Sequence, residues 1–90
     1  MSQVIVDPDE LRRFAVFLEQ SIRNLRDGQR GLQRGHQVLA DAWRDSKYNN
    51  FAKSFDQTLP ALERFCKEAE AYAAFLRRKA QLADRYLGRN

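Results

Sequence analysis

The sequence predicts an all-α protein, an antiparallel two-helix hairpin that dimerises into a four-helix bundle. Apolar side chains recur at helical spacing on both sides of a short polar stretch near the middle of the chain. Glycine and proline are few, with four and two among 90 residues, so little interrupts either pattern. The apolar side chains also outnumber those that two helices can bury against each other. These observations indicate a single helical-hairpin domain over 1–90 that needs a partner.

Length and composition restrict the classes of protein to which this chain can belong. A chain of 90 residues buries only about 60–65% of the surface that it exposes when unfolded, so its core is marginal. Cys66 is the only cysteine, which excludes an internal disulfide and a zinc site built from several thiolates. The formal net charge is +4, from 16 basic and 12 acidic residues, and it favours anionic partners without indicating a fold.

The N-terminal residues 1–6 are expected to form a short extended arm. They lack a positively charged start and a long apolar run, so they do not resemble a Sec-type signal peptide. No stretch approaches the roughly 18 apolar residues that a membrane-spanning helix requires. The expected location is therefore cytoplasmic, or secreted by a signal-peptide-independent route, or both.

A first helix is expected over about 8–42. Asp7 can cap its N-terminus, and Pro8 suits the first helical position because the N–H that it lacks would be unbonded there anyway. Two acidic residues then match the positive end of the helix dipole. The pattern behind this start is that of an amphipathic helix whose arginines lie mostly on other faces. Leucine recurs at strict heptad spacing, at Leu11, Leu18, Leu25, Leu32 and Leu39.

Three glycines raise the alternative of a loop inside this segment. Gly28, Gly31 and Gly35 each cost about 1 kcal/mol relative to alanine in a helix interior, and a loop there would produce three helices. The leucine heptad stays in phase across them, which a loop of arbitrary length would not preserve. One continuous helix is therefore favoured, and the glycines then mark a weak point or a place of close backbone approach.

The bend is expected at about 43–45, and a second helix over about 46–86. Asp45 or Ser46 can cap the second helix, which at 1.5 Å per residue measures roughly 60 Å. Pro60 removes one backbone hydrogen bond, so a kink is expected near this residue. The apolar face of the second helix comprises Tyr48, Phe51, Phe55, Leu59, Leu62, Phe65, Cys66, Ala69, Tyr72, Ala73, Leu76, Ala80, Ala83 and Leu87.

The irregularities of the two helices are expected to face each other. With the bend centred on Arg44 and Asp45, antiparallel register places Pro60 opposite Gly28 and Gly31. We therefore hypothesise one shared bulge. A straight second helix, or a proline far from those glycines, would contradict it.

A surplus of apolar side chains points to dimerisation. Besides the main stripe, the second helix carries another one, and Phe17 lies beside the main stripe of the first helix. Two helices joined by a short bend cannot cover these side chains, whereas two hairpins packed as a four-helix bundle can. A monomer is expected to expose too much apolar surface to behave well in solution. The second stripe consists of Phe65, Tyr72, Phe75, Leu82 and Tyr86.

The helix start and the bend together carry a resemblance to a known family. The chain opens its first helix with VDPDELRRF, places its only tryptophan, Trp43, at the bend, and follows it with Phe51 and Phe55. In this it resembles the WXG family of type VII secretion substrates, the ESAT-six-like proteins, over nearly its whole length. The resemblance implies a helix-turn-helix protomer and a homodimer, or a heterodimer with a similar small helical protein. It also implies secreted effectors, carriers or partner chaperones rather than enzymes, and a secretion ATPase or an effector as a further partner.

Two positions depart from the family pattern. The motif is Trp-x-Gly, but its third position is Asp45, which tolerates turn conformations and caps a following helix, so the fold is expected to survive. Exported members, or one partner of a pair, carry Tyr-x-x-x-Asp/Glu after the second helix. Here Tyr86 is followed four residues later by Asn90, and Tyr72 by Leu76. This leaves a partner-dependent substrate, a diverged signal, or a cytoplasmic relative that is never secreted.

The candidate site residues follow from the bend and the apolar faces. Trp43 and Asp45 are the expected bend or recognition motif, in which Trp43 is read by a partner, plugs the open end of the bundle, or does both. The expected packing residues of the hairpin or dimer are Leu18, Leu25, Leu32, Phe51, Phe55, Leu62, Phe65 and Tyr72. A candidate basic surface comprises Arg77, Arg78, Lys79 and Arg85.

No catalytic, metal or cofactor site can be assembled from these residues. His36, the only histidine, has no companion at metal-ligand spacing, and Ser21 lies about four turns away on the same helix. Cys66 is expected to be a small buried hydrophobe. The leading interpretation is thus a non-enzymatic interaction protein. The alternative, a small basic helical dimer that binds nucleic acid, is weaker because basic residues near a helix C-terminus also suit the helix dipole.

Overall fold

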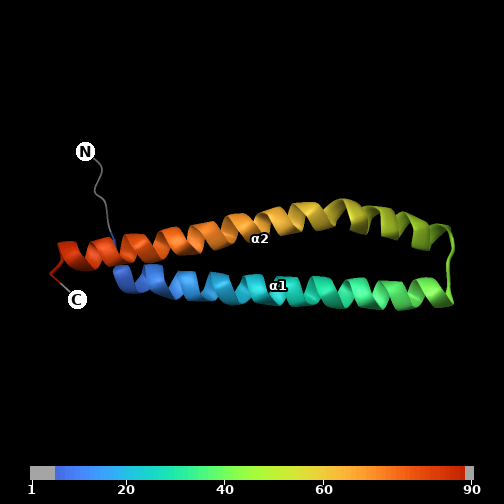
Figure 1. Ribbon diagram of the computed structural model, residues 1–90, viewed down its shortest axis with the longest axis horizontal. Coiled ribbons are helices and arrows are strands. Elements are labelled where there is room, and N and C mark those ends of the chain that lie inside the picture. Colours follow the sequence, from blue (N-terminus) through green and yellow to red (C-terminus); the bar gives the residue numbers. More distant parts are fainter. Residues whose placement is uncertain (1–5, 89–90) are drawn as a thin grey trace.

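The computed structural model describes residues 6–88, which form two long antiparallel helices joined by a short bend (Figure 1). α1 spans Pro8–Ala42 and α2 spans Ser46–Tyr86. The molecule measures 63 × 28 × 14 Å, so it is a rod one helix pair wide. The prediction of an all-α hairpin is confirmed. The arm expected at 1–6 lies outside the described residues except for Val6.

The ends of the helices are fixed by local hydrogen bonds. The Asp7 carboxylate caps α1 by accepting from the backbone N–H groups of Asp9 at 3.0 Å and Glu10 at 3.4 Å. At the C-terminus of α2, the N–H of Gly88 donates to the carbonyl of Arg85 at 3.1 Å. Gly88 has a φ of +72°, a left-handed conformation that glycine adopts without steric penalty, and this ends the helix.

The glycines of α1 lie inside a continuous helix and face open space. A β-carbon added at Gly28, Gly31 or Gly35 would meet no neighbouring atom within 4 Å. The alternative of a close backbone approach is therefore wrong within a single hairpin. α1 remains helical across them because backbone hydrogen bonding is cooperative, and the long flanking turns stabilise a short stretch of poor helix formers.

The core is a narrow seam of mostly small side chains, and all of it except Ala40 lies in the half of the hairpin near the chain ends. Ala15 packs with Ala73 and Leu76. One helix repeat further from the chain ends, Ile22 packs with Cys66 and Ala69. This differs from a core of heptad leucines, because leucines further along α1 remain exposed. The buried apolar residues are Ala15, Ile22, Ala40, Cys66, Ala69, Ala73, Leu76 and Ala80.

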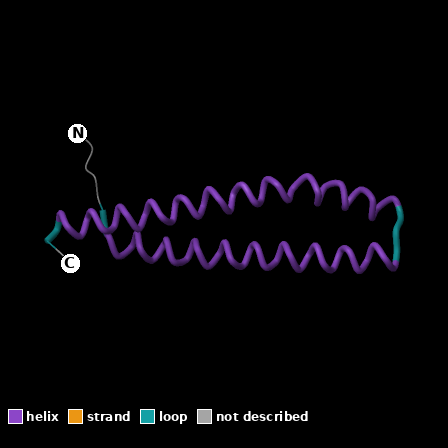
Figure 2. Tube along the Cα trace, in the orientation of Figure 1, coloured by secondary structure: helices purple, strands orange, loops and turns teal. Residues whose placement is uncertain are grey.

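The helices lie furthest apart in the half near the bend. From the chain ends α2 diverges from α1 as far as its yellow section in Figure 1, where it changes direction and runs back toward α1 before the bend; Figure 2 shows the same course. Pro60 lies inside α2, where its missing N–H removes one helical hydrogen bond. Pro60 itself is exposed, and it is the flanking Leu59 and Leu62 that line a groove together with Gly28. Because Leu59 and Leu62 flank the proline and share this groove with Gly28, Pro60 lies at the same level of the hairpin as the glycines, and the shared bulge stays a hypothesis.

Candidate functional site

The bend consists of Trp43, Arg44 and Asp45, and it needs no glycine. Trp43 has φ −157° and Asp45 has φ −143°, both extended conformations that any residue adopts. The Trp43 N–H donates to the carbonyl of Leu39 at 2.7 Å, and the Arg44 Nε donates to the carbonyl of Ala40 at 2.8 Å. Carbonyls that the end of α1 leaves unbonded are thus satisfied by the bend itself.

Asp45 connects the bend to α2 through both oxygens of its carboxylate. Oδ1 accepts from the backbone N–H of Tyr48 at 2.7 Å, which is an N-cap of α2. Oδ2 accepts from the indole Nε1–H of Trp43 at 3.1 Å. These donors, the Tyr48 amide first and the Trp43 indole second, hold the pKa of Asp45 below its usual value because they stabilise the ionised form.

Trp43 projects into solvent at the closed end of the hairpin. Trp43 is 65% exposed, and its only side-chain donor, the indole N–H, is already bonded to Asp45. It therefore does not plug the hairpin from within. Because an exposed tryptophan offers a large rigid apolar surface, it is well suited to contact a partner.

An aromatic cluster around His36 joins the helices on the inner side of the bend. The His36 ring stacks on Tyr48 with centroids 4.6 Å apart, and meets Phe51 edge-on at 5.3 Å and Phe55 at 5.8 Å. The Nε2 atom of His36 is buried and bonds no other atom of the described chain. The histidine is therefore a packing residue between the helices, which fits its expected place at the core edge.

One long side of the hairpin, here called the apolar face, is lined by apolar side chains from both helices. Its members recur at intervals of three, four or seven residues, so they share one side of each helix. Shallow grooves run along it from the bend toward the chain ends. In α1 the apolar face comprises Phe14, Leu18, Leu25, Gly28, Leu32, Gly35 and Leu39, and in α2 Phe51, Phe55, Thr58, Leu62, Phe65, Ala69 and Tyr72.

All eight predicted packing residues lie on the apolar face. Leu18, Phe55 and Leu62 are half-buried within the single hairpin, whereas Leu25 and Leu32 are exposed. The exposed members also include Phe51, Phe65 and Tyr72. The structure thus brings the predicted residues together on one surface and does not bury them inside one hairpin.

The opposite side, here called the polar face, carries the ion pairs that join the helices. Arg26 donates to Glu63 at 2.9 Å and to Glu70 at 2.8 Å. Further pairs link Arg77 with Glu19 and Arg12 with Asp84. The Arg26 guanidinium lowers the pKa of Glu70, and Arg77 lowers that of Glu19, because each cation favours the ionised carboxylate.

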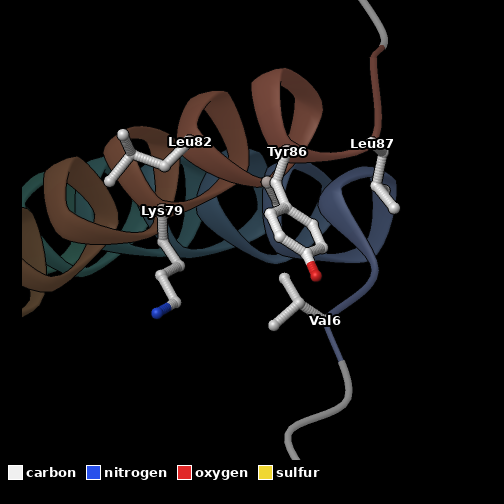
Figure 3. A pocket seen from close by; sticks show the side chains of 6 residues that line it. Val6, Lys79, Leu82, Tyr86 and Leu87 are labelled. Carbon is white, nitrogen blue, oxygen red and sulfur yellow. The ribbon is translucent and has the colours of Figure 1, made fainter.

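The candidate basic surface is not one patch. Successive helical residues point about 100° apart, so Arg77, Arg78 and Lys79 face three directions. Arg77 is paired with Glu19 on the polar face. Lys79 lines a shallow hollow near the chain ends, where Figure 3 shows it projecting from α2 beside Leu82 and Tyr86. This layout does not support the nucleic-acid alternative, which requires clustered cations.

Residues 6–88 contain neither a candidate metal site nor a candidate membrane-spanning helix. This part of the chain has no group of three or more histidine, cysteine or acidic side chains placed to hold a metal ion. Neither of its helices is long and apolar enough to cross a membrane. Cys66 is a free thiol buried in the seam, as expected for a small hydrophobe.

Three features of this surface were missed by sequence reasoning. The bond between Asp45 and the Trp43 indole depends on a side-chain rotamer, for which a sequence has no signal. The role of His36 depends on which residues α2 places opposite it. The polar face did have a signal, namely heptad spacing of charged residues along both helices, at Arg12, Glu19 and Arg26 and at Glu63, Glu70, Arg77 and Asp84.

The fold is similar to that of a secreted protein of known structure. Wild-type EsxB from Bacillus anthracis strain Sterne matches with a TM-score of 0.73 and 21% identity, over 90% of this chain and 93% of that chain. A mutant of EsxB gives the same values, and a second mutant matches with a TM-score of 0.72 and 21% identity over 90% of each chain. The expected resemblance is thereby confirmed at the level of the fold. No protein-family model and no curated protein matches the sequence.

Proposed function

We propose that this protein is a non-enzymatic interaction protein that acts as a type VII secretion substrate or as the dimer partner of one. The observation that carries the proposal is the apolar face, which runs along the hairpin while the ion pairs described above lie on the other side. A surface of this size that remains uncovered marks an interaction site. The fold shared with secreted EsxB supports the same class of function.

The partner that suits the apolar face is a second helical hairpin. Two such faces packed together form a four-helix bundle, whose core is made of side chains from all four helices. The second hairpin is another copy of this chain or a similar small helical protein. In either pairing, half-exposed side chains such as Phe65 and Tyr72 become core residues.

The bend is the proposed recognition point for a further component, such as a secretion ATPase or an effector. Trp43 lies in the bend between α1 and α2 and is 65% exposed in the single hairpin, which makes it available to a further component. Because the fourth residue after Tyr86 is Asn90 and not an acidic residue, we favour a substrate whose export depends on the signal of its partner.

Replacing Trp43 with alanine tests this role of the bend. We expect Trp43→Ala to reduce secretion of the tagged protein from its own bacterium by roughly 30-fold, as for an interface tryptophan worth about 2 kcal/mol. Helix content, measured by circular dichroism, should stay unchanged because the side chain is exposed. Val16→Ala is the control, since Val16 is 52% exposed, lines none of the grooves of the apolar face and lies far from the bend. Unchanged secretion of the Trp43 variant would overturn the proposed role.

A further inference from the structure

At the bend, each oxygen of the Asp45 carboxylate accepts a hydrogen bond from a different donor, so the two donors do not compete. Oδ1 binds the amide of Tyr48, and Oδ2 binds the indole N–H of Trp43. An ionised carboxylate is purely an acceptor, with lone pairs on both oxygens, so it can hold both donors at once. Both donors lie within three residues of Asp45, so the arrangement needs no residue outside the bend and the first turn of α2.

We propose that Asp45 is the positioning residue of the bend: it holds the Trp43 indole with its N–H turned toward the chain and its ring surface exposed. A partner must then recognise Trp43 through apolar or cation–π contact with the ring, and needs no hydrogen-bond acceptor for the indole. This inference rests on the proposed role of the bend in partner recognition and specifies the chemistry of the partner's site.

Two physical arguments explain why holding the Trp43 indole in one orientation favours recognition by a partner. A tryptophan that is already held in one orientation loses less side-chain freedom on binding than a freely rotating one. The indole has a single donor, so a pocket that offers an acceptor gains nothing once Asp45 has bonded it. Val38 and Leu39, in the last turns of α1, are exposed as well, so exposed apolar side chains precede Trp43 along the chain.

Only some residues at position 45 can perform both tasks. Asparagine caps a helix as well as aspartate does, but its second polar atom is an NH2 group, which cannot accept from the indole. Glycine, the residue of the family motif, can do neither through a side chain. Asp45→Asn is therefore the variant that separates the positioning of Trp43 from the start of α2.

The sole tryptophan permits a direct test on the purified chain. In wild type we expect one indole N–H resonance, protected from exchange with water, and a high fluorescence anisotropy for Trp43. In Asp45→Asn the indole N–H should exchange several-fold faster and the anisotropy should fall, while helix content by circular dichroism stays at the wild-type level. An indole that exchanges at the wild-type rate in this variant overturns the proposal.

A double-mutant cycle provides an independent measurement. Trp43→Phe keeps an aromatic side chain but replaces the indole and so removes the N–H; Asp45→Asn should therefore lower the melting temperature less in that background than in wild type. Equal losses in the two backgrounds would mean that the two side chains are not coupled, which contradicts the inference.

Secretion assays separate this inference from the proposed function. We expect Asp45→Asn to reduce secretion several-fold, in the same direction as Trp43→Ala. If Trp43→Ala secretes normally, the recognition role of the bend fails, whereas the exchange and anisotropy results still decide whether Asp45 positions the ring. If Trp43→Ala is impaired but Asp45→Asn, with a released indole, secretes normally, the positioning has no role in recognition and the inference is wrong.

Discussion

The carboxylate of Asp45 illustrates how one residue can replace glycine in a bend between helices. A glycine is required there only if the backbone adopts a positive φ, and neither Trp43 nor Asp45 does so. The helix caps at Asp7 and Asp45 could be predicted from the sequence because capping involves neighbouring residues. The indole bond could not, because it depends on the rotamers of two side chains.

At the same scale, Glu70 makes stability depend on pH. Arg26 lowers the pKa of Glu70 in the folded chain, so the carboxylate stabilises the hairpin above its unfolded pKa of about 4.3. This contribution is lost as the pH falls through the folded pKa, because protonation then removes the ion pair. We expect Glu70→Gln to lower the free energy of unfolding at pH 7 and to flatten its decline below pH 5, measured by urea denaturation.

Glu68→Gln is the control for this measurement, since Glu68 is exposed and takes part in none of the ion pairs of residues 6–88. It should keep the wild-type pH profile. Identical profiles for the two glutamine variants would show that the pair between Arg26 and Glu70 does not stabilise the fold.

The seam of small residues sets the distance between the two helices. Both helices and the bend could be predicted, because caps and apolar spacing are local properties of a segment. The buried residues could not, because burial depends on how the helices rotate and approach. Small side chains such as Ala15 and Ala73 are buried together between the helices, whereas Leu25 and Leu32 remain exposed.

Replacing one small residue of the seam by a larger one tests whether the two helices are tightly packed there. Ala73→Leu forces extra methyl groups between the helices and should lower the free energy of unfolding by about 1–3 kcal/mol. Ala74→Leu, one position along on the exposed side of α2, should change it by less than about 0.5 kcal/mol. Thermal or urea unfolding checks both, and equal effects would show that the seam is not tightly packed.

The glycines of α1 offer a second test at this scale. Gly31→Ala adds a β-carbon where no atom lies within 4 Å, so the gain in helix propensity should stabilise the chain by about 1 kcal/mol. Urea denaturation measures the change. A loss of stability would mean that another molecule packs closely against this position in the assembled protein.

Considered as a whole, the hairpin divides its surface into two unlike sides. The polar face satisfies its charges within one chain, as for Arg77 with Glu19, whereas the apolar face keeps side chains such as Phe65 uncovered. The surplus of apolar residues could be counted from the sequence. The division into faces could not be located, because it required the relative rotation of α1 and α2.

A charge placed on the apolar face should prevent assembly without unfolding the hairpin. Phe65 is 51% exposed in the single hairpin, so Phe65→Lys keeps the helices intact but buries a cation if a second hairpin covers this face. Sedimentation should show a dimer for wild type and a monomer for the variant. Val16→Lys, at a site that is 52% exposed and does not line the grooves described above, should remain dimeric. A Phe65 variant that is as dimeric as wild type would contradict this role of the face, whereas a monomeric wild type would mean that the second hairpin is the similar small helical protein and not another copy of this chain.

The position of the seam also determines how the chain can close on itself during folding. The ion pairs near the chain ends join residues far apart in sequence, 58 residues for Arg77 and Glu19 and 72 for Arg12 and Asp84. Contacts of this kind close long loops, and they form late because the chain entropy must be lost first. Near the bend, the ring of His36 contacts Tyr48 and Phe51 across the two helices, and no ion pair of the described residues joins them there. The covalently joined end is therefore the part that opens at least cost, and its helix spacing can adjust without breaking the contacts at the chain ends.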